Sequence, residues 1–483
     1  MRTENAKSAS AVMMKLLEEM ALFSADAERA DGGAGAVSKA AEGKDPGSRE
    51  TDSAVHAASG GTSSTGLVSG GNKPQSPVVT TGQAPAGSGP NEERGRGVTR
   101  LLYTGAWREA QHYLAERMRE FGLTARFDRV GNLYGRLQGT DPASKVILTG
   151  SHIDTVRSGG HYDGAYGIAA GIAALVSLKE RFGPPRRTLE VVSLCEEEGS
   201  RFPLSYWGSG NATGVYDLRS AATYADPDGV TMQAAMEASG FGADAQPDPL
   251  RDDLEAFVEA HIEQGVILER TGERIGIVSA IVGQRRYTLT LEGEANHAGT
   301  TPMTMRQDAL AGTAEMMLAA ETEALRHGEP LVATIGRLNV KPNTPNVVPG
   351  AVSFTLDVRH SDEAELSAFC ELLLGQFEAI AAKRSLKLTC DLWMNAKPAP
   401  MDEELSGRLQ SICAAKGMAH RTMVSGAGHD AQLFSAVCPT AMLFVPSRRG
   451  ISHSPDEYSS PEALADGLGV LTELLYQLAY EER

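Results

Sequence analysis

Residues 149–167 read TGSHIDTVRSGGHYDGAYG, and this stretch organises the chain on both sides of it. The apolar run at 146–148 before it is typical of a buried strand, and the Ala-rich apolar run at 168–178 after it predicts a helix. The polar, Gly-rich residues between them mark where the chain leaves a sheet. Open α/β sheets bind ligands at the carboxyl ends of their strands, so His152 and Asp154 suit a metal site there. Their spacing alone is a weak signal, because an ordinary loop with a hydrogen-bonded His is the more common source of it.

The overall composition excludes several classes of protein. The 483 residues suffice for two domains, and 41% hydrophobic with 22% charged residues is typical of a globular protein. A formal net charge of −17 argues against binding to nucleic acid or to an anionic membrane. The five cysteines form no CxxC pair, which indicates a reducing compartment such as the cytoplasm. We expect no membrane span, because no apolar run reaches the roughly 18–20 residues that a span needs. We expect no secretory signal, because residues 1–24 are acidic and amphipathic and lack a basic start, an apolar centre and a cleavage site.

The composition changes abruptly over residues 28–98. This segment contains no Phe, Trp, Tyr, Ile or Met, and it is dense in Gly, Ser, Ala, Thr and Pro. Such a sequence cannot bury enough apolar surface to offset the entropy of ordering it. We therefore predict a disordered insertion. A tolerated surface insertion is the simpler interpretation, and a regulatory or binding tail is the alternative.

Outside this insertion, strands alternate with helices. The expected helices are at 11–23, 106–121, 168–178, 403–416 and 461–480, and the expected strands at 125–137, 144–148, 188–194, 257–261 and 440–445. Polar residues collect at the strand ends. The pattern predicts an α/β catalytic domain with a mixed, mostly parallel sheet and helices on both faces.

The pattern changes near residue 277. Alternating, β-branched segments at 275–295, 331–340, 351–360 and 386–393, with helices at 306–326 and 363–383, predict two helices on a four-stranded antiparallel sheet. We interpret this part as a smaller inserted α+β domain. The predicted division is 1–27 with 99–277 as the first catalytic segment, 28–98 as the insertion, 278–395 as the inserted domain, and 396–483 as the second catalytic segment.

Side chains that bind metals collect at the predicted strand ends. They are His152, Asp163, Glu197, Glu198, His261 and His453. Three imidazoles with carboxylates suit zinc, manganese or another borderline divalent ion. A two-metal site needs a carboxylate shared by both ions, terminal ligands for each ion and a carboxylate base, and the neighbours Glu197 and Glu198 supply two of these roles. By itself, a run of three glutamates is more often a solvated acidic loop.

Eleven short motifs in order along residues 99–480 carry a family resemblance. They are TGSHIDTV, GGHYDG, EEEGSRFP, WGS, EAHIEQG, IVGQRRY, NHAGTTPM, NTPNVVPG, DVRH, SGAGHDAQ and GISHSPDEY. Together they resemble the allantoate amidohydrolase (allantoate deiminase) branch of the two-metal amidohydrolases, an aminoacylase-like peptidase superfamily. N-carbamoyl-L-amino-acid hydrolases and β-ureidopropionases are near relatives. The insertion at 28–98 departs from the family pattern.

The resemblance implies two divalent metal ions, manganese first and zinc as the runner-up. His152 and His261 would bind one ion, Glu198 and His453 the other, and Asp163 would bridge them. The same resemblance gives a role to three further residues. Glu197 matches the general base that takes a proton from the attacking water and returns it to the leaving nitrogen. Asp154 matches the acid that orients a ligand His. His297 matches the His that a partner subunit contributes to stabilise the oxyanion, which implies a homodimer through the inserted domain.

The resemblance also implies a set of substrate-binding residues: Gln284, His297, Asn346, Arg359 and His429. Arg359 matches a carboxylate clamp, since a guanidinium fork fits a carboxylate bidentately. Two simpler interpretations stay open. Asn346 lies between two prolines, so its simpler interpretation is a turn residue. The simpler interpretation of Arg359 is a member of a surface ion pair.

The implied reaction is the hydrolysis of allantoate to ureidoglycine, ammonia and carbon dioxide, with the inserted domain closing over the site. An N-carbamoyl-L-amino-acid hydrolase or β-ureidopropionase is the first alternative, because it would use the same metals, base and Arg359. A non-catalytic metal-binding scaffold is the second. It is disfavoured because every position matched to a ligand or to the base keeps the expected residue.

Overall fold

The computed structural model describes residues 2–25 and 97–482. The predicted disordered segment lies outside the described residues except for its last two positions. One of these, Val98, is buried and exchanges two backbone hydrogen bonds with Gly159, at 3.0 and 2.9 Å. The described backbone therefore resumes before the boundary at residue 99 that the composition predicted.

A nine-stranded sheet forms the larger core, in the order β1-β2-β4-β3-β5-β16-β6-β14, with β15 also paired to β6. The central strands β4, β3, β5 and β16 run parallel, whereas β1, β2 and β14 pair antiparallel with their neighbours. This confirms the predicted mixed α/β sheet with a parallel centre. The strand bounds are β1 Thr124–Phe127, β2 Leu133–Leu137, β3 Val146–His152, β4 Leu189–Leu194, β5 Leu254–Ile262, β6 Ile275–Ile281, β14 Ala399–Pro400, β15 His420–Ser425 and β16 Thr440–Val445.

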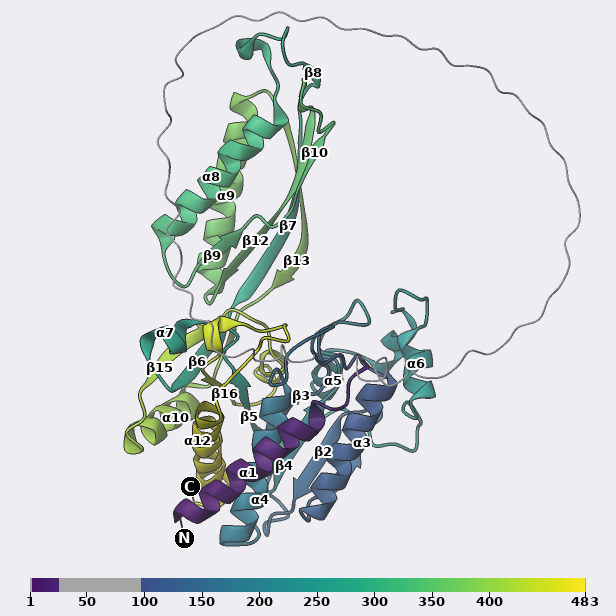
Figure 1. Cartoon of the computed structure of the whole chain (residues 1–483), viewed down its shortest axis with the longest axis vertical. Helices are drawn as coiled ribbons and strands as arrows, with labels where there is room; N and C mark the ends of the chain where they lie inside the picture. Colours follow the sequence, from purple (N-terminus) through teal and green to yellow (C-terminus); the bar gives the residue numbers. More distant parts are fainter. Residues whose placement is uncertain (1, 26–96, 483) are drawn as a thin grey trace, which may run out of the picture. The chain divides into compact units, whose positions relative to one another are not determined.

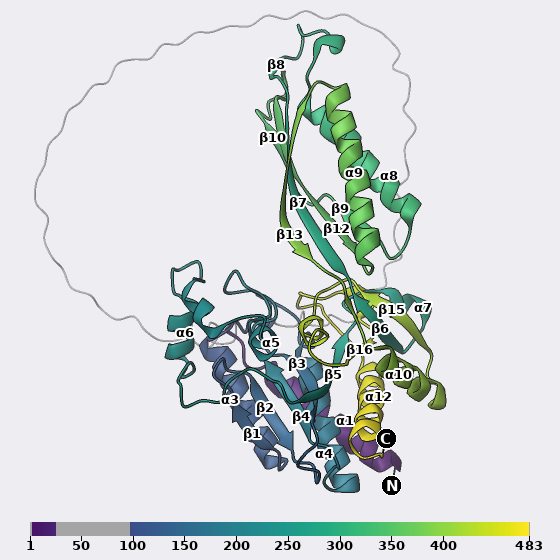
Figure 2. The ribbon, with the colours of Figure 1, turned by 180° about the vertical axis from the view of Figure 1, so that it is seen from behind.

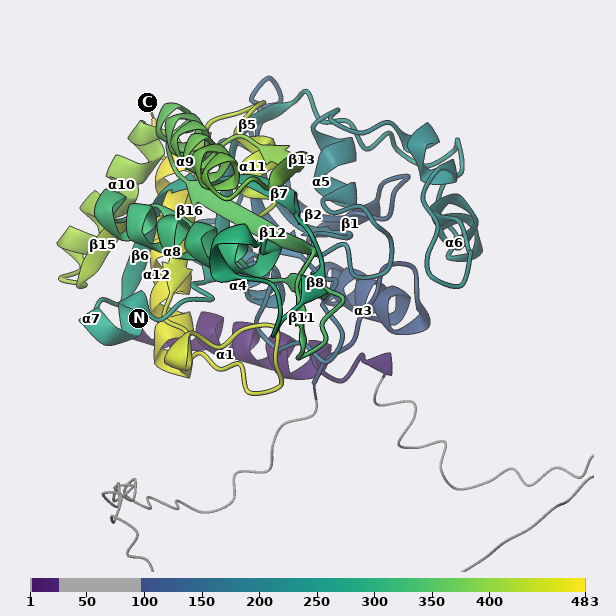
Figure 3. The ribbon, with the colours of Figure 1, turned by 90° about the horizontal axis from the view of Figure 1, so that it is seen from above.

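Four longer helices pack against this sheet, a fifth packs against two of them, and sequence features explain their ends. The side chain of Thr104 accepts from the N–H of Trp107 to start α3, and Ser460 caps α12 just before a proline at its first position. Helix α1 contacts both α4 and α12, as Figure 1 and Figure 3 show. Their bounds are α1 Arg2–Met20, α3 Gly105–Glu120, α4 Ala165–Phe182, α10 Glu403–Ala415 and α12 Pro461–Ala479. Shorter helices, not predicted, are α5 Trp207–Ala212, α6 Met232–Ala238, α7 Ile267–Thr271 and α11 Ala431–Phe434.

A second, antiparallel sheet is built from residues within 283–396. Its order is β10-β12-β7-β13, with β9 also paired to β12. Helices α8 and α9 cover one face (Figure 2), where Leu289, Leu291, Phe354 and Phe377 are buried. The bounds are β7 Gly283–Glu292, α8 Ala309–His327, β9 Val332–Thr334, β10 Leu338–Lys341, β12 Ala351–His360, α9 Glu363–Lys383 and β13 Lys387–Ala396.

The second sheet differs from the prediction in two respects. It has five strands instead of four, because the segment predicted as one strand at 331–340 is divided into β9 and β10. Strand β6, which the sequence pattern groups with the antiparallel segments, pairs with β15 and β16 of the larger sheet. A separate two-stranded ribbon joins β8 (Asn296–His297) to β11 (Val347–Val348). Among the helices of residues 2–25 and 97–482, none is both long and apolar enough to cross a membrane.

The described residues on either side of segment 26–96 are bonded to each other. The N–H of Ala25 donates to the carbonyl of Thr99 at 3.0 Å, and the N–H of Thr99 donates to Ser24 Oγ at 2.9 Å. The buried Arg100 donates to the carbonyls of Met20 and Ile153, at 2.7 and 2.8 Å. The chain thus leaves and re-enters the fold at nearly one point.

We expect that replacing residues 26–96 with a flexible Gly-Ser linker of about eight residues leaves the fold intact. Closing a shorter loop costs less entropy, so the free energy of unfolding should stay level or rise by up to about 2 kcal/mol. Thermal unfolding of the shortened and full chains measures this. As a control, the same linker in place of residues 26–100 also removes the bonds of Thr99 and Arg100 and should destabilise the protein. A large loss of stability in the first variant would contradict the expectation.

Candidate active site

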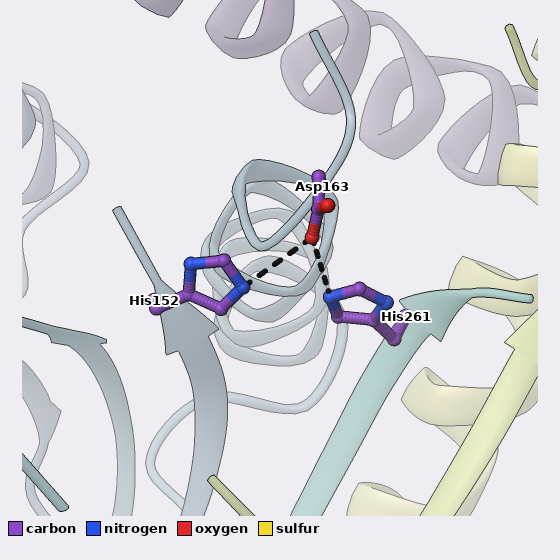
Figure 4. A group of neighbouring side chains, drawn as sticks. All are labelled: His152, Asp163 and His261. Carbon is purple, nitrogen blue, oxygen red and sulfur yellow. Dashed lines mark ion pairs between the residues drawn. The ribbon is translucent and has the colours of Figure 1, made fainter. Parts of the chain in front are cut away.

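The carboxyl ends of two neighbouring parallel strands bring the first three predicted ligands together. His152 ends β3, His261 lies near the end of β5, and Asp163 lies in the turn before α4. Figure 4 shows Asp163 pointing between the two imidazoles. Its Oδ1 lies 3.4 Å from His152 Nε2 and 3.2 Å from His261 Nε2. The turn needs Gly164, whose φ is +64° and whose added Cβ would lie 2.6 Å from the His152 ring.

The other oxygen of Asp163 faces the two remaining predicted ligands. Its Oδ2 lies 3.1 Å from His453 Nε2, and the same nitrogen lies 3.4 Å from Glu198 Oε1. The ligand atoms of His152, Asp163 and His261 lie within 4.8 Å of one another, and so do those of Asp163, Glu198 and His453. Asp163 belongs to both groups, which is the pattern of a carboxylate shared by two cations.

The chemistry of this donor set fits divalent cations. It offers only imidazole nitrogens and carboxylate oxygens, the ligands that zinc and manganese accept. Glu198 Oε1 is buried and has no hydrogen-bond partner among the described residues, so a cation would satisfy it. Burial tends to raise the pKa of Asp163, but its hydrogen bonds with His152, His261 and His453 hold that pKa well below its usual value. Asp163 is therefore a carboxylate, as a shared ligand must be.

Asp154 positions the predicted base and two of the predicted ligands. Its buried carboxylate accepts the N–H of Glu197 at 3.0 Å and the N–H of Glu198 at 3.1 Å. The same carboxylate lies 3.6 Å from His152 Nδ1. Glu196, with a φ of +52°, turns the chain so that both following glutamates line one cavity. Burial raises the pKa of Glu197 well above its usual value, which suits a group that must accept and hold a proton.

Three further residues, whose role the sequence alone does not indicate, hold Asp163 in place. Gln264 Nε2 donates to Asp163 Oδ2 at 2.9 Å, and the Ser452 hydroxyl lies 3.2 Å from the same oxygen. Glu457 Oε1 accepts the N–H groups of Tyr162 and Asp163, at 2.9 and 3.2 Å. All three lie inside or beside quoted motifs, yet their role follows only from contacts between distant segments.

A cavity of about 640 Å³ contains this cluster. It is also lined by three of the predicted substrate-binding residues, Gln284, Arg359 and His429. His429 is buried and lies 3.0 Å from Ser425 Oγ, and burial holds its pKa well below the usual value, so it is a neutral imidazole. Arg359 lines the cavity and forms an ion pair with Asp357, as the simpler of the two sequence interpretations expects, and its role as a carboxylate clamp stays a prediction.

The other two predicted substrate-binding residues lie elsewhere. His297 and Asn346 are exposed and adjacent, because β8 pairs with β11 and the N–H of Ala298 donates to the carbonyl of Asn346 at 3.0 Å. Neither is among the described residues that line the cavity. The structure therefore brings nine of the sequence-predicted site residues to one cavity and places these two together on a separate ribbon. Asp154 lies behind the cavity and accepts a hydrogen bond from the backbone of its wall.

Comparison with known proteins agrees with the resemblance carried by the motifs. Residues 148–477 match the family described as Peptidase family M20/M25/M40. The chain is 49% identical over 384 residues to the allantoate amidohydrolase of Bacillus subtilis (strain 168), which covers 80% of this chain and 93% of that protein. It is 47% identical over 386 residues to the allantoate amidohydrolase of Escherichia coli (strain K12), covering 80% and 94%. Among solved structures, an amidase of the hydantoinase/carbamoylase family from Burkholderia multivorans superposes with a TM-score of 0.77 at 36% identity, covering 81% of this chain and 95% of that one.

We expect Mn²⁺ or Zn²⁺ to stabilise the folded protein and Asp163→Asn to abolish this effect, because Asp163 faces both ligand groups. A cation at about 100 times its Kd stabilises the native state by about 2.7 kcal/mol. Thermal unfolding with chelator and with restored metal measures the difference. Asp391→Asn, an equal change at an exposed position of β13, is the matched control and should keep the full metal effect. An unchanged metal effect in Asp163→Asn would rule out the shared-ligand assignment.

Proposed function

Since the chain belongs to peptidase family M20/M25/M40, we propose that it is a metal-dependent hydrolase of a ureido C–N bond, with allantoate as its substrate. The products would be ureidoglycine, ammonia and carbon dioxide. The observation that carries this proposal is the 49% identity to an allantoate amidohydrolase across 93% of that protein's length. An intact donor set and base around one cavity support a catalytic role over that of a scaffold.

We propose that two divalent ions bind here, manganese first and zinc as the runner-up. His152 and His261 would hold one, Glu198 and His453 the other, with Asp163 shared. Such ions supply Lewis acidity, which polarises a carbonyl and lowers the pKa of water. The donor set accepts either metal.

Glu197 is proposed as the proton carrier. It lines the cavity beside the ligand groups, and its buried carboxylate has a raised pKa. In the reaction, water adds to the ureido carbonyl carbon and the bond to the terminal nitrogen breaks. Glu197 takes a proton from the water and returns it to that nitrogen, which leaves as ammonia, and the remaining carbamic acid loses carbon dioxide. Gln284, Arg359 and His429 would bind the rest of the substrate from the cavity wall.

We further propose a homodimer in which each site is completed by the partner subunit. His297 and Asn346 are exposed on the β8–β11 ribbon and do not line the cavity of their own chain among the described residues. Residues 278–395 would then form a lid and dimerisation domain. We place the protein in the cytoplasm, because all five cysteines are described and none is paired.

An N-carbamoyl-L-amino-acid substrate is the second candidate. The 36% identity to an amidase of the hydantoinase/carbamoylase family supports it, and the same ligands and base would serve. This identity is lower than the 49% and 47% to the two allantoate amidohydrolases, so allantoate is favoured over an N-carbamoyl-L-amino acid.

We predict that the metal-loaded protein releases ammonia from allantoate, and that Glu197→Gln loses about 10²- to 10⁴-fold in kcat while it still binds metal. Glu196→Gln is the matched control, because this neighbouring carboxyl group does not line the cavity. Ammonia release and metal content measure the two effects. Turnover of an N-carbamoyl amino acid without turnover of allantoate would replace the substrate and keep the site. Absence of turnover on both would contradict the catalytic proposal.

We also predict that mixing two inactive variants, His297→Ala and Glu197→Gln, restores activity after subunit exchange. In a two-fold dimer with sites completed in trans, mixed dimers carry one intact site, so about a quarter of the wild-type activity should return. Ammonia release before and after exchange measures it. If the His297→Ala variant is fully active alone, or if exchange between proven dimers restores nothing, the trans role fails.

A further inference from the structure

Strand β7 presents two of its polar side chains to the cavity. Successive side chains on a strand point to opposite faces, and Gln284 and Arg286 both line the cavity. The side chains between and after them point the other way: Tyr287 is buried in the core beneath α8 and α9, and Arg285 donates to Ser367 and Glu363 of α9. Figure 1 shows these helices on one face of the sheet. Arg286 therefore belongs to the substrate side of the sheet, although the family resemblance assigned it no role.

The guanidinium of Arg359 is largely committed within the chain. Its Nε donates to Asp357 Oδ1 and its Nη2 donates to Asp357 Oδ2, both at 3.0 Å. Its Nη1 donates to the carbonyl of Gly426 at 2.7 Å. The fork that would clamp a carboxylate bidentately is thus already occupied by Asp357. Only the second hydrogens of its two terminal nitrogens remain for a ligand.

Arg286 keeps the terminal end of its guanidinium available. It lies directly opposite Asp357 in the β7–β12 register and donates through Nε to Asp357 Oδ2 at 2.8 Å. Its guanidinium lies 5.7 Å from the centroid of the Trp393 ring, a cation–π contact that orients it. Neither terminal nitrogen has a hydrogen-bond acceptor among the described residues, and the side chain is 30% exposed. Its position is fixed while its four terminal N–H groups stay free.

The donors on this face outnumber the acceptors of a simple ureido acid. Two guanidinium groups share one aspartate, so the wall carries a net positive charge and three side-chain donors in Gln284, Arg286 and Arg359. In a ureido acid with one ureido group, that group is the one to be cleaved and lies at the metal ligands. Only the carboxylate then remains as a hydrogen-bond acceptor for the donors of the wall. A diureido acid also offers a second ureido carbonyl. An unmatched guanidinium would lose hydrogen bonds to water without replacement.

We propose that Arg286 is a specificity-determining residue, whose terminal N–H groups bind the second ureido carbonyl of a diureido acid. This inference deepens the proposed function and rests on it for the identity of the substrate. It assigns recognition of the carboxylate to Arg359 and Gln284, and selection between one and two ureido groups to Arg286.

The test compares two ligands that differ only in the second ureido group, allantoate and N-carbamoylglycine. Binding to metal-loaded Glu197→Gln protein is measured by calorimetry, with and without Arg286→Gln. A hydrogen bond from a charged donor predicts that Arg286→Gln weakens allantoate binding about 10- to 100-fold. N-carbamoylglycine binding should change far less. In the active enzyme, the same substitution should raise KM for allantoate more than it lowers kcat.

Arg285→Gln is the matched control, because it removes the same charge from the neighbouring residue, whose side chain points toward α9. It should leave the selectivity between the two ligands unchanged. Arg286→Lys keeps the charge without the planar fork, should lose part of the selectivity, and carries the test if the Gln variant unfolds.

Equal weakening of both ligands by Arg286→Gln, or no weakening, would overturn the proposal. If allantoate binds selectively through Arg286 but the wild type does not hydrolyse it, the proposed function fails and the assignment of Arg286 stands. If the wild type hydrolyses allantoate and Arg286→Gln binds and processes it unchanged, the assignment fails and the function stands.

Discussion

The site depends on one carboxylate, Asp163, whose two oxygens face three imidazoles at 3.1 to 3.4 Å. Three ring nitrogens converge on a single carboxylate only if segments far apart in sequence end at one place. The parallel centre of the larger sheet achieves this, because β3 and β5 end side by side and the turn before α4 passes between them. Gln264 and Ser452 then contact the carboxylate of Asp163, and Glu457 accepts its backbone N–H.

The backbone around this carboxylate adopts conformations that an unconstrained chain avoids. Glu196 is left-handed, which costs roughly 1–2 kcal/mol for a residue with a side chain. The buried Asp154 carboxylate offsets this cost by accepting the N–H groups of Glu197 and Glu198. The same aspartate lies beside the ring of His152. One buried acid thus couples the geometry of a proposed ligand to that of the proposed base, and neither would hold its orientation alone.

The sequence predicts the regular elements well where periodicity is strong. Strand β12, strand β16 and helix α9 begin and end at the expected residues. The expected strand at 125–137 is instead two strands, because Asp128 accepts the N–H groups of Val130 and Asn132 and closes a turn between them. That is local turn chemistry which apolar periodicity does not register. Short helices such as α5 are not predicted for a related reason, since fewer than two turns contain too few residues to show a helical period.

The ligand types were predictable from strand ends, whereas their supporting contacts were not. A strand end fixes where His152 and His261 emerge, but the partners of Asp163 come from residues 264, 452 and 457, whose approach is decided by tertiary packing. The contacts on the sheet face that carries Arg359 are likewise not predictable from the sequence alone. Its sequence motif indicates a clamp, yet only the register of β12 with β7 reveals that Asp357 lies between two guanidinium groups.

The hydrogen bonds of Arg100 connect the N-terminal helix to the site. Its fully buried guanidinium donates to the carbonyl of Met20, at the end of α1, and to that of Ile153, the residue before Asp154. Burial lowers the pKa of Arg100 to about 10, and the nearby charge of Asp154 partly opposes this. The buried cation is stabilised by these two carbonyl acceptors and by the charge of the buried Asp154 carboxylate, which it offsets in turn. Helix α1 and the residues just after segment 26–96 are therefore structural parts of the site, although none of them touches the cavity.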